Sequence, residues 1–406
     1  MTLGFNADLK SFQSMRMFVH RIGISSAIWQ AGMKNRQTDA KYRVGLIGCG
    51  RKGTEHARGY RFHPLTEVVA AADTDSENLE LFCERLDVPG YADYEEMLDK
   101  ERIDIAAPIL PTSVNPEVVL TCATSGVKAI FCEKPMSASL EDADRMVEVC
   151  RSLGIKFAAG DAFRNLPQYW SAREMIEAGE IGEILSINLY DATSTISGAG
   201  CQGLSLMRMF AWDSDVDQVV GHVMTDPFCD DDQDMGGYVR FCNGIECLVH
   251  AKSAARRGLE VMGSHGTFAS DYSSFHLWKL NRGGDPRSAK LSELHEIEGL
   301  FHDVTYEPIY DSDGKGLPGN RQMASIQSIV DSLEKDIEPR CSGDNMLKVL
   351  EIAIGLRESH RRGHASVKLP LKDRSLKIIP VPARWLNKKE VYGREWYAKE
   401  MDRYEQ

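Results

Sequence analysis

The chain has 406 residues, of which 43% are hydrophobic, and this is enough apolar material for two packed cores. Its formal net charge of -12 disfavours nucleic acid or an anionic membrane surface as a main partner, because both attract clustered lysine and arginine. No run approaches the ~18 consecutive apolar residues that span a bilayer. We therefore expect two domains and a small, uncharged ligand.

Ten cysteines are scattered along the chain without CxxC pairs or zinc-finger spacing. This usage favours reduced, packed thiols in a cytoplasmic protein over disulfides or a metal centre. The first 41 residues lack a clean apolar segment and a cleavage site of small residues. We interpret them as an extension that packs on a neighbour, with a targeting role as the alternative.

Short apolar runs alternate with helical patterns from Tyr42 onward. Apolar runs without strict alternation suit a sheet that is buried on both faces, and we predict five such strands: 44–47, 68–72, 103–109, 129–132 and 157–159. The helices predicted between them are 54–62, 76–86, 116–125 and 139–153, the last with a near capping box from Ser139 to Asp142. Strand and helix in turn indicate parallel βαβ units, an α/β fold with a doubly wound sheet.

The pattern changes beyond about residue 163. A helical segment at 167–178 precedes strand-like runs with turn residues between them: 184–190, 216–223, 237–241, 246–251, 259–262 and 267–270. Consecutive strands without helices indicate an antiparallel sheet, hence an α+β domain, and we expect two late helices, 322–334 and 344–361, to cover one face of it. The predicted boundaries are an extension at 1–41, an α/β domain at 42–162, an α+β domain at 163–371 and a tail at 372–406, with a polar loop at 281–290.

The segment VGLIGCGRKGTEHA has three glycines in the spacing GxGxxG, after one predicted strand and before a helix. Gly48 permits the tight turn, Gly50 lets a pyrophosphate approach the backbone, and Gly53 lets the helix and strand pack closely. The pattern therefore predicts a dinucleotide bound by a Rossmann domain. A glycine turn without a ligand is the alternative.

The acid that holds the adenosine ribose is expected about 20 residues further on. Asp73 closes the run VVAAAD, and 73 minus 53 is 20. An acid at this place repels a 2′-phosphate, so NAD is favoured over NADP. Arg51 and Lys52 could bind that phosphate, but they lie in the phosphate turn, where solvated residues are common at a helix start.

The stretch AIFCEKPMS sets a lysine between an acid and a proline just after the predicted strand 129–132. Ligands of doubly wound sheets lie beyond the carboxyl ends of the strands, so we expect Lys134 to project toward the cofactor. Pro135 fixes the backbone, and Glu133 can orient the ammonium or the nicotinamide ribose. Beside a positively charged ring, Lys134 releases its proton more readily and can exchange it with a sugar hydroxyl. A solvated lysine at a strand end is the alternative.

Four motifs occur here in one order: GLIGCGRKG, AAADTD, FCEKP and GDAFRN. With them, residues 42–371 resemble the Gfo/Idh/MocA family, which includes glucose-fructose oxidoreductase and inositol 2-dehydrogenase. The resemblance implies a Rossmann domain, and a second domain with a large, open, mostly antiparallel sheet whose free face often forms homodimers or homotetramers. It also implies bound NAD(P) and oxidation or reduction of a sugar, cyclitol or related hydroxyl.

The resemblance also implies roles for individual residues. Lys134 corresponds to the catalytic lysine, and Glu133 to a contact on the nicotinamide side. Pro111 and Asn115 would line the cofactor after the preceding strand, and Arg164 would lie near the nicotinamide and the substrate.

One helix departs from the pattern of such enzymes, which reads D-x-G-x-H-x-x-D-L-x-R. The corresponding stretch is GAGCQGLSLMR, so that Gly198 stands for the first acid, Gln202 for the histidine and Ser205 for the second acid. Gln202 can hold a substrate hydroxyl by hydrogen bonds, but it cannot take up a proton. Proton transfer then falls to Lys134 alone or to a substitute, for which the alternatives are three residues whose simpler interpretation is structural: Tyr190, Asp191 and His222.

Other features of the sequence are assigned to structure, and no metal site is expected. The acidic run 226–234, DPFCDDDQD, lacks EF-hand spacing and is interpreted as a solvated loop. Three histidines, His250, His265 and His276, form no HExxH pair. Cys201 has no readable base beside it, so we expect it to be a packing residue.

The sequence thus predicts a cytoplasmic NAD-dependent oxidoreductase that acts on a hydroxyl of a sugar, glycoside or cyclitol. Nucleic acid and membranes are not expected as partners. One alternative is an NAD-dependent glycoside hydrolase or lyase that oxidises C3 transiently, eliminates the aglycone and reduces the sugar again. The second alternative is a non-catalytic NAD-binding sensor or subunit.

Overall fold

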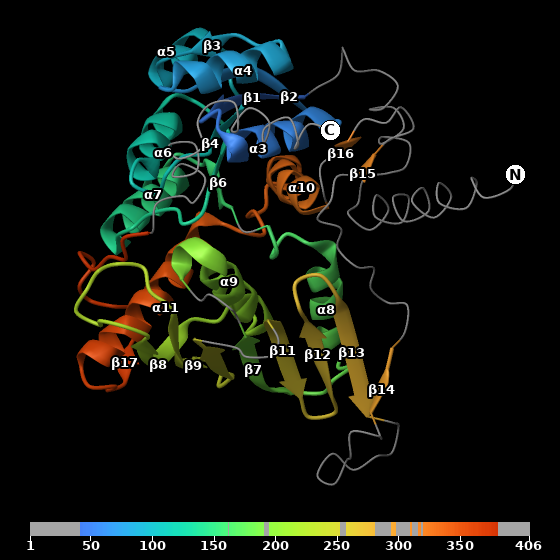
Figure 1. Ribbon diagram of the computed structural model, residues 1–406. Helices are drawn as coiled ribbons and strands as arrows, with labels where there is room; N and C mark the ends of the chain where they lie inside the picture. The colour runs from blue at the N-terminus through green and yellow to red at the C-terminus, as the bar shows by residue number, and fades with distance from the viewer. Residues whose placement is uncertain are drawn as a thin grey trace, which may run out of the picture.

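The computed structural model describes residues 41–160, 162–190, 195–251, 257–280, 294–297, 309–310, 316–317 and 320–380. Figure 1 shows two sheets, a smaller one with helices around it in the upper half and a larger one in the lower half. The predicted extension, apart from Lys41, and the predicted loop 281–290 lie outside the described residues. No helix in the described ranges is long and apolar enough to cross a membrane.

The upper sheet has six strands in the order β3-β2-β1-β4-β5-β6, and all neighbouring strands are parallel. Residues of β4 and β5 are buried throughout, which confirms a sheet covered on both faces. The Ser139 hydroxyl accepts a hydrogen bond from the Asp142 amide at 3.1 Å, so the predicted helix cap is present. The strands are β1 Tyr42–Ile47, β2 Thr66–Ala72, β3 Gly90–Tyr91, β4 Ile105–Pro108, β5 Ala129–Cys132 and β6 Lys156–Ala159. The helices are α3 Arg51–Phe62, α4 Ser76–Leu86, α5 Tyr94–Lys100, α6 Asn115–Thr124 and α7 Leu140–Ser152.

The lower sheet has nine strands in the order β14-β13-β12-β11-β7-β10-β9-β8-β17. Its pairs are antiparallel except for β7 and β10, which run parallel, so the predicted mostly antiparallel sheet is confirmed. The strands are β7 Ile184–Tyr190, β8 Val216–Val223, β9 Met235–Phe241, β10 Glu246–His250, β11 Gly258–Gly263, β12 Gly266–Ser270, β13 Phe275–Leu280, β14 Leu294–Glu296 and β17 Val367–Lys368. A separate pair consists of β15 Ile309–Tyr310 and β16 Gly316–Leu317.

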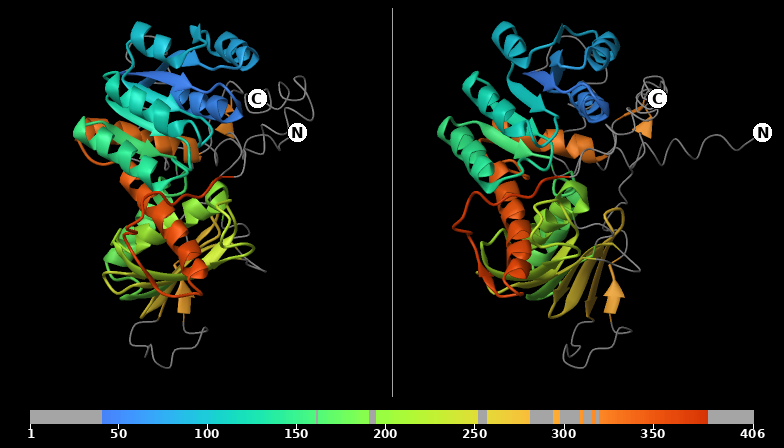
Figure 2. Two further views of the ribbon diagram at one scale, coloured as in Figure 1. Left: turned by 90° about the vertical axis from the view of Figure 1, so that its left-hand side faces the viewer. Right: turned by 60° about the vertical axis from the view of Figure 1, so that its left-hand side comes forward.

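One face of the lower sheet is covered by helices. Burial alternates along β7, where Ile187 and Leu189 are buried while Ser186 and Asn188 are partly exposed. Figure 2 shows α11 along the covered face. The helical elements after β6 are α8 Pro167–Glu177, η1 Ile196–Gly200, α9 Cys201–Phe210, α10 Asn320–Lys335 and α11 Gly343–Arg361. Of these, α10 packs against the Rossmann sheet instead.

Helix α10 does not cover the lower sheet, so that part of the prediction is wrong. Its buried residues Ile326, Ile329 and Val330 join the core of the Rossmann sheet with Tyr60. A Cβ atom on Gly59 of α3 would lie 2.3 Å from the Ile326 Cδ1 atom, so α10 crosses α3 at a glycine. The apolar stripe of α10 suits either sheet, and only packing selects one.

The described part of the predicted tail links the two halves. On one side the Leu140 amide donates to the Leu376 carbonyl at 3.1 Å, and the Ile378 amide donates to the Ala138 carbonyl at 2.8 Å. On the other side the Ile379 amide donates to the Asp230 carbonyl at 2.8 Å. This segment therefore joins the start of α7 to the loop between β8 and β9.

Candidate active site

The glycine turn is closed by backbone contacts that exclude larger residues. Gly48 has a φ of +102°, and a Cβ atom on it would lie 2.5 Å from the Ile109 carbonyl oxygen. A Cβ atom on Gly53 would lie 1.9 Å from the Gly48 carbonyl oxygen. Both distances are below van der Waals contact, so this packing of β1, α3 and the end of β4 requires glycine at both positions.

Helix α3 begins directly after this turn at a residue that has no side chain. Gly50 is the N-cap residue and makes no side-chain cap hydrogen bond, and the first turn has no acidic residue. Such an N-terminus suits the phosphates of a dinucleotide, because its amides and the helix dipole attract an anion. Arg51 and Lys52 pair with Glu55 at 3.4 and 2.7 Å, and their predicted contact with the cofactor stays a prediction.

Asp73 follows β2 and is bound to the glycine turn. Its Oδ2 atom accepts a hydrogen bond from the Cys49 amide at 2.6 Å, and its Oδ1 atom accepts one from the Asp75 amide at 2.8 Å. The carboxylate is thereby held beside the start of α3. Each carboxylate oxygen has a further lone pair for a ribose hydroxyl, so the geometry fits the predicted adenosine contact.

Lys134 follows the end of β5, and its amine reaches the other domain. Its Nζ atom donates to the Ser197 and Gly198 carbonyl oxygens, both at 2.8 Å. These carbonyls belong to η1, where Gly198 has a non-helical backbone with ψ of -132°. An ammonium has three N–H donors, so these two bonds leave one donor for a substrate oxygen.

Glu133 joins the lysine to helix α3 through a residue that sequence reasoning missed. Its Oε1 atom lies 2.9 Å from the His56 Nε2 atom, and its Oε2 atom accepts from the Lys134 amide at 3.0 Å. Burial opposes the charge on Glu133, but the bond from His56 and the charges of His56, Lys52 and Lys134 outweigh it and lower its pKa to about 2. The carboxylate is therefore ionised near neutral pH.

Asn115, at the start of α6, makes hydrogen bonds to the loop that carries Glu133 and Lys134. Its Nδ2 atom donates to the Glu133 carbonyl at 3.2 Å and the Pro135 carbonyl at 3.4 Å. Its Oδ1 atom is buried without a partner in the described structure, which leaves an acceptor for a donor such as the cofactor's carboxamide. Pro111 precedes α6 and accepts a hydrogen bond from the Val114 amide at 3.1 Å. Its predicted cofactor contact stays a prediction.

Gln202 lies in the first turn of α9, four residues after Gly198. It is partly exposed, and within the described residues no hydrogen bond ties down its side chain. The amide is therefore available for a substrate hydroxyl, as its predicted role requires. Cys201 beside it is buried, which matches the predicted packing role.

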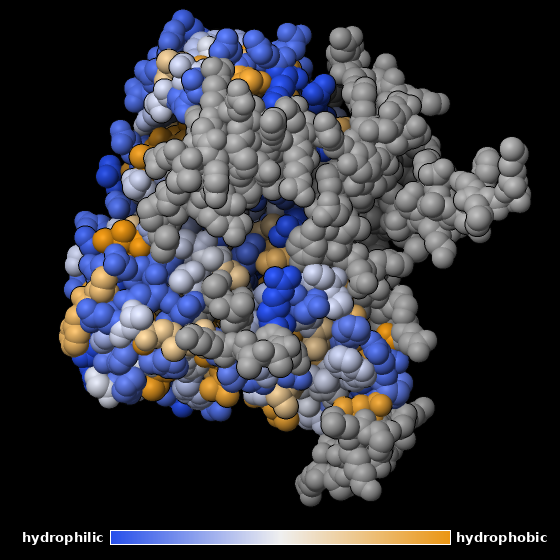
Figure 3. Space-filling model, in the orientation of Figure 1, coloured by the Kyte–Doolittle hydropathy of each residue, from blue (hydrophilic) through white to orange (hydrophobic). Residues whose placement is uncertain are grey.

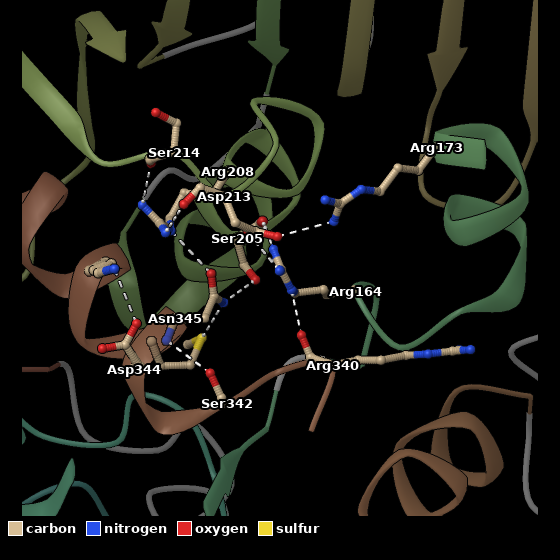
Figure 4. Close-up of polar contacts among 12 residues, drawn as sticks. Arg164, Arg173, Ser205, Arg208, Asp213, Ser214, Arg340, Ser342, Asp344 and Asn345 are labelled. Atoms are coloured by element: carbon tan, nitrogen blue, oxygen red, sulfur yellow. Dashed lines mark hydrogen bonds and ion pairs between the residues drawn. The ribbon is translucent and has the colours of Figure 1, made fainter. Parts of the chain in front are cut away.

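The predicted contacts of Arg164 with nicotinamide and substrate need correction. Its Nε atom donates to the Arg340 carbonyl at 2.5 Å, its Nη1 atom to the Ser205 carbonyl at 2.9 Å, and its Nη2 atom to Asp213 at 2.6 Å. Figure 4 shows these bonds. Since the side chain is buried and every nitrogen is engaged, the structure supports a role in fixing α9 in place of ligand binding.

The buried side of α9 is tied to α11 by a second set of bonds in Figure 4. The Asn345 Nδ2 atom donates to the Ser205 Oγ atom at 2.8 Å, and the Arg208 Nε atom donates to the Asn345 Oδ1 atom at 3.1 Å. Burial lowers the pKa of Arg208, although nearby acids oppose this. These contacts fix the position of α9, the helix that carries Gln202, relative to α11.

Of the three alternative proton acceptors, Tyr190 is engaged elsewhere, His222 lies on β8, and Asp191 is not among the described residues. Tyr190 stacks on His250 with 4.7 Å between ring centroids, and its hydroxyl donates to Glu260 at 3.3 Å. Burial lowers the pKa of His222, and the charges of His360 and His364 lower it further. Asp191 is outside the described ranges. The described residues contain no group of three metal-ligating side chains.

The acidic run 226–234 is not simply a solvated loop, and Asp232 is the residue that sequence reasoning missed. Its side chain is 6% exposed and accepts hydrogen bonds from the Ile196 amide at 2.8 Å and the Ser197 amide at 2.7 Å. Burial raises its pKa, while the bonds from Ser197 and Ile196 and the charge of Lys134 oppose this. The prediction failed because the sequence of a run with five acids does not show which of them the loop buries.

The glycine turn, the start of α3, Asp73 and the unpartnered Asn115 oxygen together fit a bound NAD. Residues 42–160 match the model of an oxidoreductase family with an NAD-binding Rossmann fold, GFO_IDH_MocA. The Rossmann domain of this chain, residues 42–160, is that of the Gfo/Idh/MocA family. The family resemblance and the NAD cofactor predicted from the sequence are thereby confirmed.

Relatives match this chain in sequence, and solved structures share its fold. The myo-inositol 2-dehydrogenase of Thermotoga maritima is 28% identical over 56% of this chain and 75% of that protein. The 2,7-anhydro-N-acetylneuraminate hydratase of Escherichia coli is 33% identical over 35% of this chain and 37% of that protein. An oxidoreductase from Agrobacterium radiobacter, solved with NAD+, L-tartaric acid and magnesium, shares the fold with a TM-score of 0.65 at 18% identity, covering 81% of this chain and 98% of its own.

Proposed function

We propose that this Gfo/Idh/MocA oxidoreductase transfers hydride between NAD and a hydroxyl-bearing carbon of a sugar, glycoside or cyclitol. The observation that carries the proposal is the place of Lys134. It follows β5 at the carboxyl edge of the Rossmann sheet, where cofactors lie, and its amine reaches the η1 segment of the second domain. A hydroxyl between the two domains would therefore meet this amine. The myo-inositol dehydrogenase relative supports the substrate class.

The residues divide the work of binding and proton transfer. NAD, when bound, accepts or returns the hydride of the substrate carbon as CH–OH and C=O interconvert. Lys134 exchanges the hydroxyl proton at the third position of its amine, which the Ser197 and Gly198 carbonyls do not occupy. There the lone pair of the neutral amine accepts the proton in oxidation, and the N–H of the ammonium returns it in reduction. Glu133, ionised and fixed by His56, holds the lysine backbone. Gln202 holds a neighbouring hydroxyl of the substrate.

A second candidate function is the hydrolase or lyase reaction with transient oxidation at C3. Two observations favour keeping it. Gly198 and Gln202 stand where the family's acid and histidine would be, so the second proton-transfer group is missing. A relative of 33% identity is a hydratase, and addition of water involves no net oxidation. We propose this reaction as the alternative to net dehydrogenation.

One assay separates these functions. The full chain is incubated with NAD and a panel of free sugars, cyclitols including myo-inositol, and nitrophenyl glycosides, while NADH absorbance and released nitrophenol are followed. Accumulating NADH supports the dehydrogenase. Nitrophenol release without accumulated NADH supports the transient-oxidation reaction. NAD binding with neither signal would replace both by the third prediction, a non-catalytic NAD-binding sensor or subunit.

We also propose a homodimer or homotetramer that forms through the open face of the lower sheet. Leu248 and Met262, on β10 and β11, are 47% and 42% exposed, and these strands flank β7 in the sheet. Figure 3 shows further apolar atoms along the lower edge of the molecule. Light scattering of the wild type and of a Leu248→Asp variant tests this state. A wild-type monomer would contradict it.

The ten free cysteines support the predicted cytoplasmic location, because a reducing compartment keeps thiols unpaired. No disulfide joins any of them, and seven are buried among core residues. We therefore propose that the reaction takes place in the cytoplasm on a small carbohydrate or polyol, without nucleic acid or membrane as a partner.

A further inference from the structure

The two carbonyls that hold Lys134 depend on an unusual backbone segment. Ser197 and Gly198 lie in η1, and Gly198 has a non-helical conformation inside it. A carbonyl oxygen can orient an ammonium only if its own peptide group is fixed. In this chain the acid that the family pattern places at position 198 is a glycine, so no side chain from that position can fix the lysine.

The carboxylate of Asp232 fixes this segment from the other side. It accepts hydrogen bonds from the Ile196 and Ser197 amides at 2.8 and 2.7 Å, and from the Ser197 hydroxyl. The Ser197 residue thus donates its N–H to Asp232 and offers its carbonyl to Lys134. A single residue separates the carboxylate from the ammonium, and hydrogen bonds to charged groups at both of its ends hold it in one orientation.

Asp232 itself is held by the scaffold. Its amide donates to the Ile379 carbonyl at 2.9 Å. Two residues earlier, the Asp230 carboxylate pairs with Arg357 at 3.3 Å and Arg361 at 3.0 Å, both on α11. In Figure 1 the loop between β8 and β9 passes along α11, as these ion pairs require. The carboxylate therefore stands on an anchored loop, so its position does not depend on a bound substrate.

We propose that Asp232 is a positioning residue for Lys134, acting through the peptide groups of Ile196, Ser197 and Gly198. It compensates for the acid that is missing at Gly198 with a carboxylate from a different part of the chain. The catalytic importance of this arrangement rests on the proposed function of Lys134. The arrangement itself is tested without any substrate.

The test measures how accessible and reactive the Lys134 amine is. The full-length wild type and two variants, Asp232→Asn and Asp231→Asn, are treated briefly with the N-hydroxysuccinimide ester of acetic acid, and acetylation at each lysine is measured by mass spectrometry. Asp231 is the matched control, because it is the neighbouring residue, is exposed and loses the same charge. Lys128, exposed after α6, serves as the reference lysine in each sample.

Asp232→Asn should raise Lys134 acetylation relative to Lys128 by about fivefold, the equivalent of one lost net hydrogen bond. The amide has one acceptor oxygen where the carboxylate has two, and its NH2 group faces backbone donors. Asp231→Asn should leave the ratio unchanged. An equal ratio in both variants would overturn the proposal.

Two further measurements keep the result decisive. If Asp232→Asn unfolds and all lysines react, Ser197→Ala, which removes only the hydroxyl bond, takes its place: a rise selective for Lys134 supports the proposal, and no rise overturns it. The dissociation constant of NADH, from its fluorescence, should stay within about twofold of the wild type, because the hydrogen bonds of Asp232 within the described ranges go to Ile196, Ser197 and Ile379 and not to the glycine turn. A parallel loss of NADH binding would show that Asp232 supports the whole cofactor site and would also overturn it.

Failure of the proposed function would appear differently. A chain that binds NADH but turns over no compound in the panel refutes the dehydrogenase and leaves the acetylation result standing. With a substrate found, Asp232→Asn should lower kcat about tenfold or more with little change in the KM for NAD, since only the proton-transfer group is displaced. A change confined to KM would contradict the positioning role.

Discussion

Replacement of Glu133 by glutamine tests how the lysine-bearing strand is tied to the cofactor helix. The pair of Glu133 and His56 is largely buried, and the folded pKa of Glu133 is about 2 against an ordinary value of 4.5. The difference is about 2.5, which corresponds to about 3 kcal/mol of folding free energy near pH 7. Glu133→Gln keeps the shape of the side chain and removes this contribution.

The pH dependence gives the sharper test. Because the folded pKa is below the unfolded pKa, the stabilisation is fully present above about pH 4.5 and is lost as the pH falls toward about 2. Urea denaturation of both proteins between about pH 7 and pH 3 should therefore show a difference in unfolding free energy that shrinks to about half.

The control is Glu148→Gln, which neutralises an exposed carboxylate in the middle of α7 and should change the midpoint little. If the difference in unfolding free energy between the wild type and Glu133→Gln is the same at all of these pH values, the assigned contribution of the Glu133 charge is refuted. The bond to His56 would then contribute through its geometry alone, and the charge of Glu133 would not matter for folding.

Three further predictions concern the cofactor and the reaction. Lys134→Ala should lower kcat by about 10²- to 10⁴-fold while NADH still binds, as stopped-flow absorbance and fluorescence titration would show; wild-type turnover would contradict its role. Gly53→Ala should lose NADH binding and lower the midpoint of thermal unfolding, because its Cβ atom would lie 1.9 Å from the Gly48 carbonyl oxygen. Calorimetry measures this midpoint, and an unchanged value would contradict the prediction. Asp73→Ser should shift the ratio of kcat/KM for NAD over NADP by at least about tenfold toward NADP, and an unchanged ratio would exclude Asp73 as the ribose contact.

The sequence predicted those parts of the site that depend on residues close to one another in the chain. The spacing of Gly48 and Gly53 specifies a turn because both residues act within a few positions of each other. Asp73 was found because one helix and one strand, α3 and β2, separate it from that turn, and β2 places it at the same edge of the sheet. The predicted strands of both sheets are present. The sequence analysis missed β3 and the helix α5 in the first domain, β13, β14 and β17 in the larger sheet, and the separate pair β15 and β16.

The sequence did not predict contacts between distant segments. His56 and Glu133 are 77 residues apart, and nothing in the pattern around His56 marks it as a partner of the EKP loop. Asp232 was one of several neighbouring acids, and only the path of the loop along α11 selects it for burial. For Arg164 the family resemblance indicated a ligand contact, but the three oxygens that its guanidinium finds come from segments 41 to 176 residues away.

The sequence by itself determined the Rossmann domain, the preference for NAD and the position of the lysine, because backbone conformation at glycines and strand ends follows from residues a few positions apart. The tertiary structure decided which sheet α10 joins, which carboxylate lies behind the lysine and which arginine is structural. Such choices depend on burial, and burial is a property of the packed chain: the same apolar stripe or acidic run is compatible with several partners until the domains meet.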